Sequence, residues 1–206
     1  MADSHGRPDT ITAASEYLKL RGCTALVHLG DICDSLCPET ARACVDIIQS
    51  QEIIALKGNN DHSLAGSLAT RKGPAALSAV AEFLISLPIV YRHANAIFTH
   101  SRPFFEELGP VSLIGTMDID AVQQFFDKAP AAILFRGHAH TPGIVWLASQ
   151  DVVAQPMAAH VSIDLASRIP CVVTCGALTH GYCMTWYPQE GRLVCHCFTD
   201  SDPQPS

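Results

Sequence analysis

The chain has 206 residues, of which 16% are charged, and its formal net charge is −7 with ten histidines counted as neutral. This length is sufficient for one domain with a substantial core. The acidic balance and the lack of any Lys/Arg run argue against duplex nucleic-acid binding as the main role, because such binders present a basic surface to the phosphates. No apolar stretch approaches the roughly 20 residues that span a bilayer, and the start MADSHGRPD lacks the regions of a signal peptide. We therefore expect no membrane association and a cytoplasmic location.

The nine cysteines are an odd number and are not spaced as a small disulfide scaffold. In a chain of this size with no recognisable export signal, free thiols are the first expectation. Cys195 and Cys197 alternate within LVCHCF, which is typical of a strand and favours ordinary packing. A zinc site that combines them with Cys171 and Cys175 is the alternative, although the paired Cys-x-x-Cys spacing is missing.

The first half of the chain alternates short apolar runs with helical patterns. Helical spacing of apolar residues predicts helices at 10–22, 38–51, 74–86 and 118–128. Strands are expected at 24–29 and 53–57, the second of which runs into a polar turn, then in a hairpin over 88–101 and at 131–137. From residue 144 onward the pattern predicts only strands, at 144–149, 152–156, 160–165, 171–176, 182–188 and 192–198. This order predicts an α/β sandwich with mixed sheets, in a single domain over 1–199 with a flexible tail at 200–206.

The N-terminus departs from this strand–helix order. A strand should precede the first helix, yet only Met1 and Ala2 stand before the polar residues DSHG. A strand that carries site residues in such a sheet should be central and buried. We therefore expect the natural protein to begin upstream, with about five to eight apolar residues forming that strand. The present chain should then show a gap or a substitute filler in its sheet.

A polar group follows each of five expected strand ends. In an open α/β sheet, ligands bind beyond the carboxyl ends of the strands, and glycines there permit tight turns around an ion. Oxygen and nitrogen groups of these kinds suit Mn, Fe or Zn. A polar loop that happens to contain histidine remains the alternative for each motif alone, but five motifs in order favour a metal site. They are Asp3-Ser4-His5-Gly6, Gly30-Asp31-Ile32-Cys33-Asp34, Gly58-Asn59-Asn60-Asp61, Thr99-His100-Ser101 and Gly137-His138-Ala139-His140.

This order of motifs resembles the calcineurin-like metallophosphoesterase superfamily, whose pattern is Asp-x-His, Gly-Asp-x-x-Asp, Gly-Asn-x-Asp/Glu, His and Gly-His-x-His. The resemblance covers Asp3 to His140, and the short length is most similar to the small single-domain phosphodiesterase branch. It implies a four-layer α/β/β/α sandwich of two mixed β-sheets flanked by helices, the metallo-dependent phosphatase fold. It also implies two divalent metal ions, with Mn²⁺ favoured and Fe, Zn or Ni as alternatives.

The resemblance further implies the roles of the motif residues. One ion would be held by Asp3, His5 and His140, the other by Asn59, His100 and His138, and both would be bridged by Asp31.

Four neighbours of these ligands have expected supporting roles. Asp34 is expected to orient ligands, and Asp61 to brace the Asn59 loop. Asn60 stands where the family often has histidine, so it could donate a hydrogen bond to a phosphate but cannot act as an acid. His62 is the candidate to substitute as a catalytic residue, with an ordinary solvated loop histidine as the alternative. His28, within a strand, is expected to be a core or supporting histidine.

The resemblance implies a metal-dependent hydrolase of phosphoric esters, with a phosphodiesterase favoured. A hydroxide bridging the two ions would attack the phosphorus of a small phosphorylated substrate. The alternatives are a phosphomonoesterase or protein phosphatase, and a non-catalytic scaffold of the same fold like the retromer subunit. The complete set of seven ligands favours the enzyme, because a scaffold could lose ligands without penalty. A homo-oligomer is compatible with the sequence.

Overall fold

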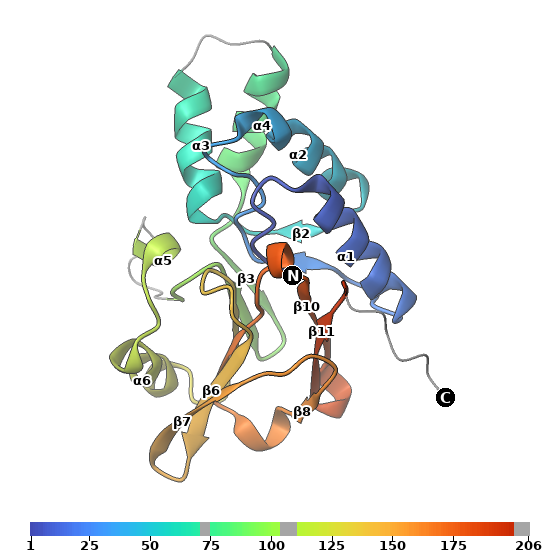
Figure 1. Ribbon diagram of the computed structural model, residues 1–206. Helices are drawn as coiled ribbons and strands as arrows, with labels where there is room; N and C mark the ends of the chain where they lie inside the picture. The colour runs from blue at the N-terminus through green and yellow to red at the C-terminus, as the bar shows by residue number, and fades with distance from the viewer. Residues whose placement is uncertain (71–74, 104–110, 200–206) are drawn as a thin grey trace.

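The computed structural model describes residues 1–70, 75–103 and 111–199. Four helices gather over one end of the molecule, and most of the strands lie below them (Figure 1). The α-helices of the described residues are α1 (Pro8–Leu20), α2 (Ala41–Ser50), α3 (Asn59–Thr70), α4 (Ala75–Ser86), α5 (Val111–Ile114) and α6 (Ile119–Lys128). The strands are β1 (Val27–His28), β2 (Ile54–Ala55), β3 (Val90–His93), β4 (Ala96–Thr99), β5 (Ile133–Arg136), β6 (Gly143–Ala148), β7 (Asp151–Pro156), β8 (Ser162–Asp164), β9 (Cys171–Thr174), β10 (Tyr182–Tyr187) and β11 (Arg192–Cys197).

The largest sheet has six strands in the order β3-β4-β5-β9-β6-β7. Strands β4, β5 and β9 run parallel, whereas β3, β6 and β7 pair antiparallel, so the sheet is mixed. Strands β1 and β2 form a separate parallel pair, and β10-β11-β8 form a separate antiparallel sheet. The expected hairpin at 88–101 is present as β3 and β4.

Three buried apolar clusters separate the layers of the sandwich. One lies between helices α1, α2 and α4 and the region of β1, and it contains Ile11, Ile48 and Leu84. A second lies between the sheets and includes the stacked rings of Phe98 and Phe135, whose centroids are 5.0 Å apart. The third packs α6 on the outer face of the six-stranded sheet. Helices therefore cover both sides of two packed layers of strands, which confirms the expected α/β/β/α sandwich.

Two α-helices were not expected from the sequence, the short α5 and the longer α3. The structure begins α3 at Asn59, where the pattern predicted a polar turn and no helix before residue 74. That prediction is wrong because the polar start and Gly66 obscure a narrow apolar stripe, which buries Leu64, Ala65 and Leu68. The metal-site motif thus forms the first turn of a helix rather than an open loop.

The first residues of the chain pair with β1. The Leu29 amide donates to the Met1 carbonyl at 2.9 Å, and the Asp3 amide donates to the Gly30 carbonyl at 3.0 Å. Strands β1 and β10 are edge strands of two separate sheets.

The cysteines are free thiols, and Cys195 and Cys197 lie buried on β11 as a strand pattern predicted. Among the described residues, no helix combines the length and apolarity required to cross a membrane.

Two histidines are held neutral in the interior. Burial, followed by the charge of the chain's N-terminal ammonium, lowers the pKa of His28 to about 3. Its Nδ1 accepts from the Gly30 amide at 3.3 Å, so Nε2 carries the proton toward Ser4 Oγ at 3.1 Å. Burial also lowers the pKa of His196 to about 4, and its Nε2 lies 3.0 Å from Thr185 Oγ1.

These lowered pKa values predict acid sensitivity of the fold. The unfolded chain takes up protons near pH 6.5 that the folded His28 and His196 do not, so stability should fall as pH drops from about 6.5 toward 4. Each histidine should contribute a slope of about 1.4 kcal/mol per pH unit within that window. His196→Gln, which keeps a hydrogen-bonding group beside Thr185, should reduce the slope by about one proton in urea unfolding at pH 7, 6 and 5. An unchanged slope would contradict the assignment.

Candidate metal centre

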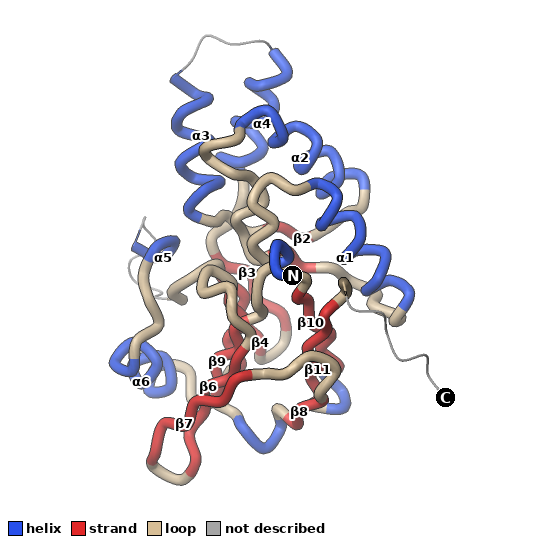
Figure 2. The backbone as a smooth tube through the Cα atoms, in the orientation of Figure 1, coloured by secondary structure: helices blue, strands red, loops and turns tan. Residues whose placement is uncertain are grey.

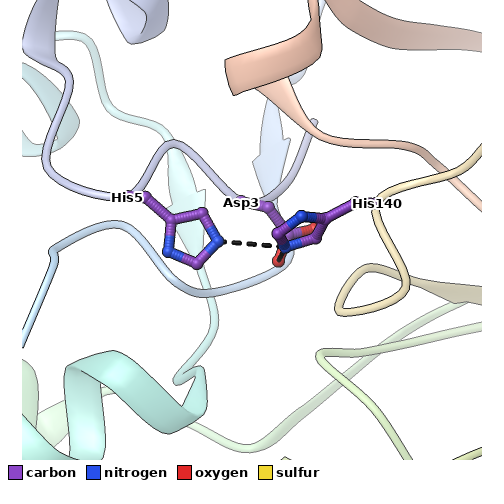
Figure 3. Close-up of side chains that lie close together, drawn as sticks. All are labelled: Asp3, His5 and His140. Atoms are coloured by element: carbon purple, nitrogen blue, oxygen red, sulfur yellow. Dashed lines mark hydrogen bonds and ion pairs between the residues drawn. The ribbon is translucent and has the colours of Figure 1, made fainter.

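Side chains from the five motifs meet at one point beyond the strand ends. Asp3, His5 and His140 lie together although His140 is 135 residues from His5 in sequence (Figure 3). Their ligand-type atoms fall within 4.8 Å of one another, and so do those of Asp3, Asp31 and His100. The two groups share Asp3, so they form one continuous centre.

The backbone is left-handed at most of the predicted ligands. Residues other than glycine seldom adopt positive φ, and each instance costs on the order of 1–3 kcal/mol. The φ angles at the site are 58° at Asp3, 45° at His5, 54° at Asp31, 66° at His138 and 59° at His140. Such a concentration of strain is typical of a functional site held by its surroundings.

Glycine permits two of these loops to touch. A Cβ placed on Gly58 would lie 2.1 Å from the Asp31 amide nitrogen and 2.2 Å from its Oδ1. A Cβ on Gly30 would lie 2.6 Å from the Gly58 nitrogen. The backbones after β1 and β2 therefore approach each other closely enough to bring Asp31 and Asn59 to one place only because neither glycine has a side chain.

The first half of the centre contains two imidazoles and a buried carboxylate. His5 Nε2 lies 3.0 Å from His140 Nε2, and His140 Nε2 lies 3.6 Å from Asp3 Oδ1. The Asp3 carboxylate also accepts from the backbone amide of His138 at 3.0 Å. Burial acts to raise the pKa of Asp3, but the His140 hydrogen bond and the nearby histidines outweigh it and lower that pKa. The same hydrogen bond raises the pKa of His140.

The second half contains Asn59, His100 and His138. His100 Nδ1 lies 2.9 Å from the Leu29 carbonyl, which can only accept, so in the neutral ring the Nε2 lone pair faces the centre. That Nε2 is 3.0 Å from Asn59 Oδ1 and 3.3 Å from His138 Nδ1. Burial, and then the charge of His100, lowers the pKa of His138, which favours the neutral ring that a metal requires.

Asp31 lies between the two halves. Its Oδ2 is 3.9 Å from His5 Nε2, and its Oδ1 is 3.6 Å from His100 Nε2. Asn60 fixes this orientation, because its backbone amide donates to Oδ1 and its Nδ2 donates to Oδ2, both at 2.8 Å. Asn60 Oδ1 accepts in turn from Ser35 Oγ at 2.9 Å. Asn60 therefore positions Asp31, and this uses one of its two side-chain N–H donors.

The other predicted neighbours differ in their surroundings. Asp61 is fully buried and accepts from the amides of Cys33 and Gly58, both at 2.9 Å, and of Ile32 at 3.3 Å. Burial and the nearby Asp31 raise the pKa of Asp61 to about 6. Asp34 Oδ1 accepts from the Leu36 amide at 2.8 Å, which shapes the turn after the Asp31 motif. His62 is exposed on α3, and its catalytic role stays a prediction.

The donor set fits divalent metal ions. Imidazole nitrogens, carboxylate oxygens and an amide oxygen converge here, and each can offer a lone pair to a cation. His100 has the arrangement common to metal-bound histidines, with the second ring nitrogen hydrogen-bonded to a backbone carbonyl. Nitrogen and oxygen ligands without thiolate suit Mn, Fe or Zn.

Sequence reasoning missed one residue at the edge of the centre. The His180 ring packs edge-on against His140, with centroids 5.6 Å apart. It lies in the short 3-10 helix Leu178–His180, in the β-rich half of the chain, with no motif around it. Nothing in the local sequence signals this proximity, which arises from the backbone bond of the Leu178 amide to the Ala2 carbonyl at 2.8 Å.

The fold and the donor set together define a metal-dependent phosphoesterase. The family model for the calcineurin-like phosphoesterase superfamily domain matches residues 1–156. The chain belongs to this superfamily. Comparison with curated proteins gives no significant match.

Solved structures share the fold at low sequence identity. A metallophosphoesterase from Sphaerobacter thermophilus is 19% identical with a TM-score of 0.69, covering 95% of this chain and 85% of its own. A provisionally assigned diadenosine tetraphosphatase is 15% identical with a TM-score of 0.56, covering 95% and 91%. The protein TT1561 of Thermus thermophilus is 9% identical with a TM-score of 0.54, covering 96% of each chain.

The three amide bonds to Asp61 predict a large effect of an almost isosteric change. Asp61→Asn should reduce the free energy of unfolding by about 2–3 kcal/mol, because an amide NH₂ must then face backbone N–H donors in the interior. Asp46→Asn is the matched control, because that carboxylate is exposed and pairs with Arg42 on the same helix. Urea unfolding of the metal-free proteins would measure both, and equal midpoints would contradict the role of Asp61.

Proposed function

We propose that the protein is a phosphodiesterase with a dinuclear metal centre. The observation that supports this most directly is the convergence of Asp3, His5, Asp31, Asn59, His100, His138 and His140 on one continuous site. When bound, two divalent ions would hold a phosphate group and supply a hydroxide nucleophile at neutral pH. Asp3, His5 and His140 would hold one ion and Asn59, His100 and His138 the other, with Asp31 shared.

The protein's own groups would keep this site in a fixed geometry. The Leu29 carbonyl accepts a hydrogen bond from His100 Nδ1, which leaves the lone pair of the neutral ring on the inward-facing Nε2. The backbone amide and the side-chain amide of Asn60 each donate to one oxygen of Asp31. Pre-oriented ligands need no rearrangement during the reaction, which is the main contribution of a protein to phosphoryl transfer.

The engagement of Asn60 supports phosphodiesters as substrates. Its Nδ2 donates one hydrogen to Asp31 and its Oδ1 accepts from Ser35 Oγ, and because an amide is not an acid, Asn60 cannot protonate a departing alkoxide. We therefore propose that the substrate carries a leaving group stable as an anion, as in aryl or nucleotide diesters. Small phosphorylated molecules of this kind, dinucleoside polyphosphates among them, belong in the substrate panel.

The first expected outcome concerns metal content. Protein dialysed against Mn²⁺ should retain two ions per chain by elemental analysis, and its melting temperature should rise with Mn²⁺ concentration, because only the folded chain presents the site. Asp31→Ala should lose this response, whereas Asp46→Asn should keep it. A wild-type protein that neither retains metal nor gains stability would contradict the proposal.

The second expected outcome concerns turnover. With Mn²⁺, bis(p-nitrophenyl) phosphate should be hydrolysed with a higher kcat/KM than p-nitrophenyl phosphate. Asp31→Ala should abolish the activity, and Asn60→Ala should reduce kcat/KM about 10- to 100-fold, because the shared ligand loses its support.

His93→Gln on the exposed end of β3 is the matched histidine control and should retain full activity. His62→Gln decides whether that residue takes part. Equal rates in wild type and Asp31→Ala would mean that the site is wrong.

A further inference from the structure

The short 3-10 helix Leu178–His180 is attached to the loops of the first and last metal-site motifs, which carry Asp3 and His140. It lies outside residues 1–156, the part of the chain that the family model matches. In Figure 2 this helix lies beside the start of the chain. Three backbone amides at the helix donate to carbonyls of the two loops. These bonds run from Leu178 to Ala2 at 2.8 Å, from Thr179 to Asp3 at 3.4 Å and from Ala177 to His140 at 3.1 Å.

Leu178 also anchors this helix in the core. Its side chain is almost fully buried and belongs to the apolar cluster under the helices, together with Ile11 of α1. Its carbonyl accepts from the Gly181 amide at 2.9 Å, which closes the turn. Because both the backbone and the side chain are held, the helix carries His180 at a fixed position relative to the metal centre.

The His180 side chain is exposed beside the centre. Its ring lies 5.6 Å from the His140 ring, centroid to centroid, and the two planes meet at 79°. The side chains of His140 and His5 are 35% and 22% exposed, whereas Asp3 is buried. Solvent therefore reaches the part of the centre that adjoins His180.

The His180 ring has an available hydrogen-bond donor. His180 is not among the groups whose ligand atoms fall within 4.8 Å of one another, which include Asp3, His5 and His140. Within residues 1–70, 75–103 and 111–199, no group forms a hydrogen bond with its ring nitrogens. A neutral imidazole always carries one N–H. This N–H is therefore free to bind a ligand at the centre.

A phosphate oxygen is the acceptor that fits this donor best. In the proposed function the substrate brings its phosphate to ions held in part by His140, so phosphate oxygens are the substrate atoms closest to the neighbouring His180 ring. Hydrogen bonds to an ionised acceptor are roughly twice as strong as bonds between neutral groups. On the opposite half of the centre, Asn60 has given one of its two side-chain N–H donors to Asp31.

We propose that His180 is a substrate-binding residue whose ring N–H donates to an oxygen of the phosphate held at the metal centre. This role rests on the proposed function. The β-rich half of the chain thereby supplies one group to a site whose metal ligands all come from the first 140 residues.

The test compares three substitutions of His180. His180→Gln keeps an N–H donor without the ring, His180→Phe keeps a ring without the donor, and His180→Ala keeps neither. With Mn²⁺ and bis(p-nitrophenyl) phosphate, His180→Ala and His180→Phe should lower kcat/KM about 10- to 100-fold. His180→Gln should stay within about threefold of wild type, and His93→Gln is the exposed histidine control that should match it.

Inorganic phosphate tests the same contact without turnover. It should raise the melting temperature of the Mn²⁺-loaded wild type and of His180→Gln, and it should do so less for His180→Ala and His180→Phe. The response to Mn²⁺ alone should be the same in all four proteins, because His180 holds no ion. If the diester is not hydrolysed but the phosphate responses follow this order, the proposed function fails and the role of His180 stands.

Three results would overturn the role of His180. The first is full kcat/KM and a full phosphate response in His180→Phe, because the ring would then act by packing rather than by donation. The second is a weaker Mn²⁺ response in His180→Ala, because His180 would then support the metal. The third is a phosphate response that is equal in all four proteins or missing from the wild type.

Discussion

The crowding of unshared electron pairs at one point is the constraint on which the rest of this structure depends. His5 and His140 bring their Nε2 atoms to 3.0 Å, and His100 Nε2 lies 3.0 Å from the Asn59 oxygen. Groups of this kind attract one another at such distances only when a proton or a cation lies between them. The loops that carry these groups are held partly by backbone hydrogen bonds, such as those from the Asp3 amide to the Gly30 carbonyl and from the Gly137 amide to the His100 carbonyl, both at 3.0 Å.

Asp61 shows how that fixing is achieved. Its buried carboxylate accepts from amides of the loop after β1, at Ile32 and Cys33, and from the amide of Gly58 after β2. One side chain thereby ties together two loops that carry Asp31 and Asn59. Asn60 adds a second tie by binding both Asp31 oxygens. His5 and His140 are partly exposed, whereas Asp3, Asp31 and His100 are buried.

The site was far more predictable from sequence than its surroundings. The types of the ligand residues and their order after the strand ends can be read from short stretches of sequence. Once the fold class is predicted, these strand ends lie together, so His138 and His100 are expected to converge. Helix α3 was missed because Asn59 and Gly66 suggest a loop, and only tertiary burial of Leu64 and Leu68 decides for a helix. His180 could not be found at all, since its approach to His140 depends on pairing between chain segments far apart in sequence.

The engagement of Asn60 by Asp31 and Ser35 was likewise beyond sequence reasoning, because the residue type allows a contact to substrate equally well. Local patterns specify which atoms are available, and packing specifies which of them are already occupied.

The left-handed backbone at Asp3, His5, Asp31, His138 and His140 has an evolutionary consequence. Glycine, and to a lesser degree asparagine, adopts this conformation at lower cost than aspartate or histidine. Selection for a durable fold alone would therefore replace these residues, and each replacement would relieve backbone strain and charge crowding together. A descendant freed from the need for catalysis should drift toward glycine at these positions and become more thermostable as it loses its activity. On this reasoning, backbone strain at these five residues is a cost in stability that a fold without this site would not need.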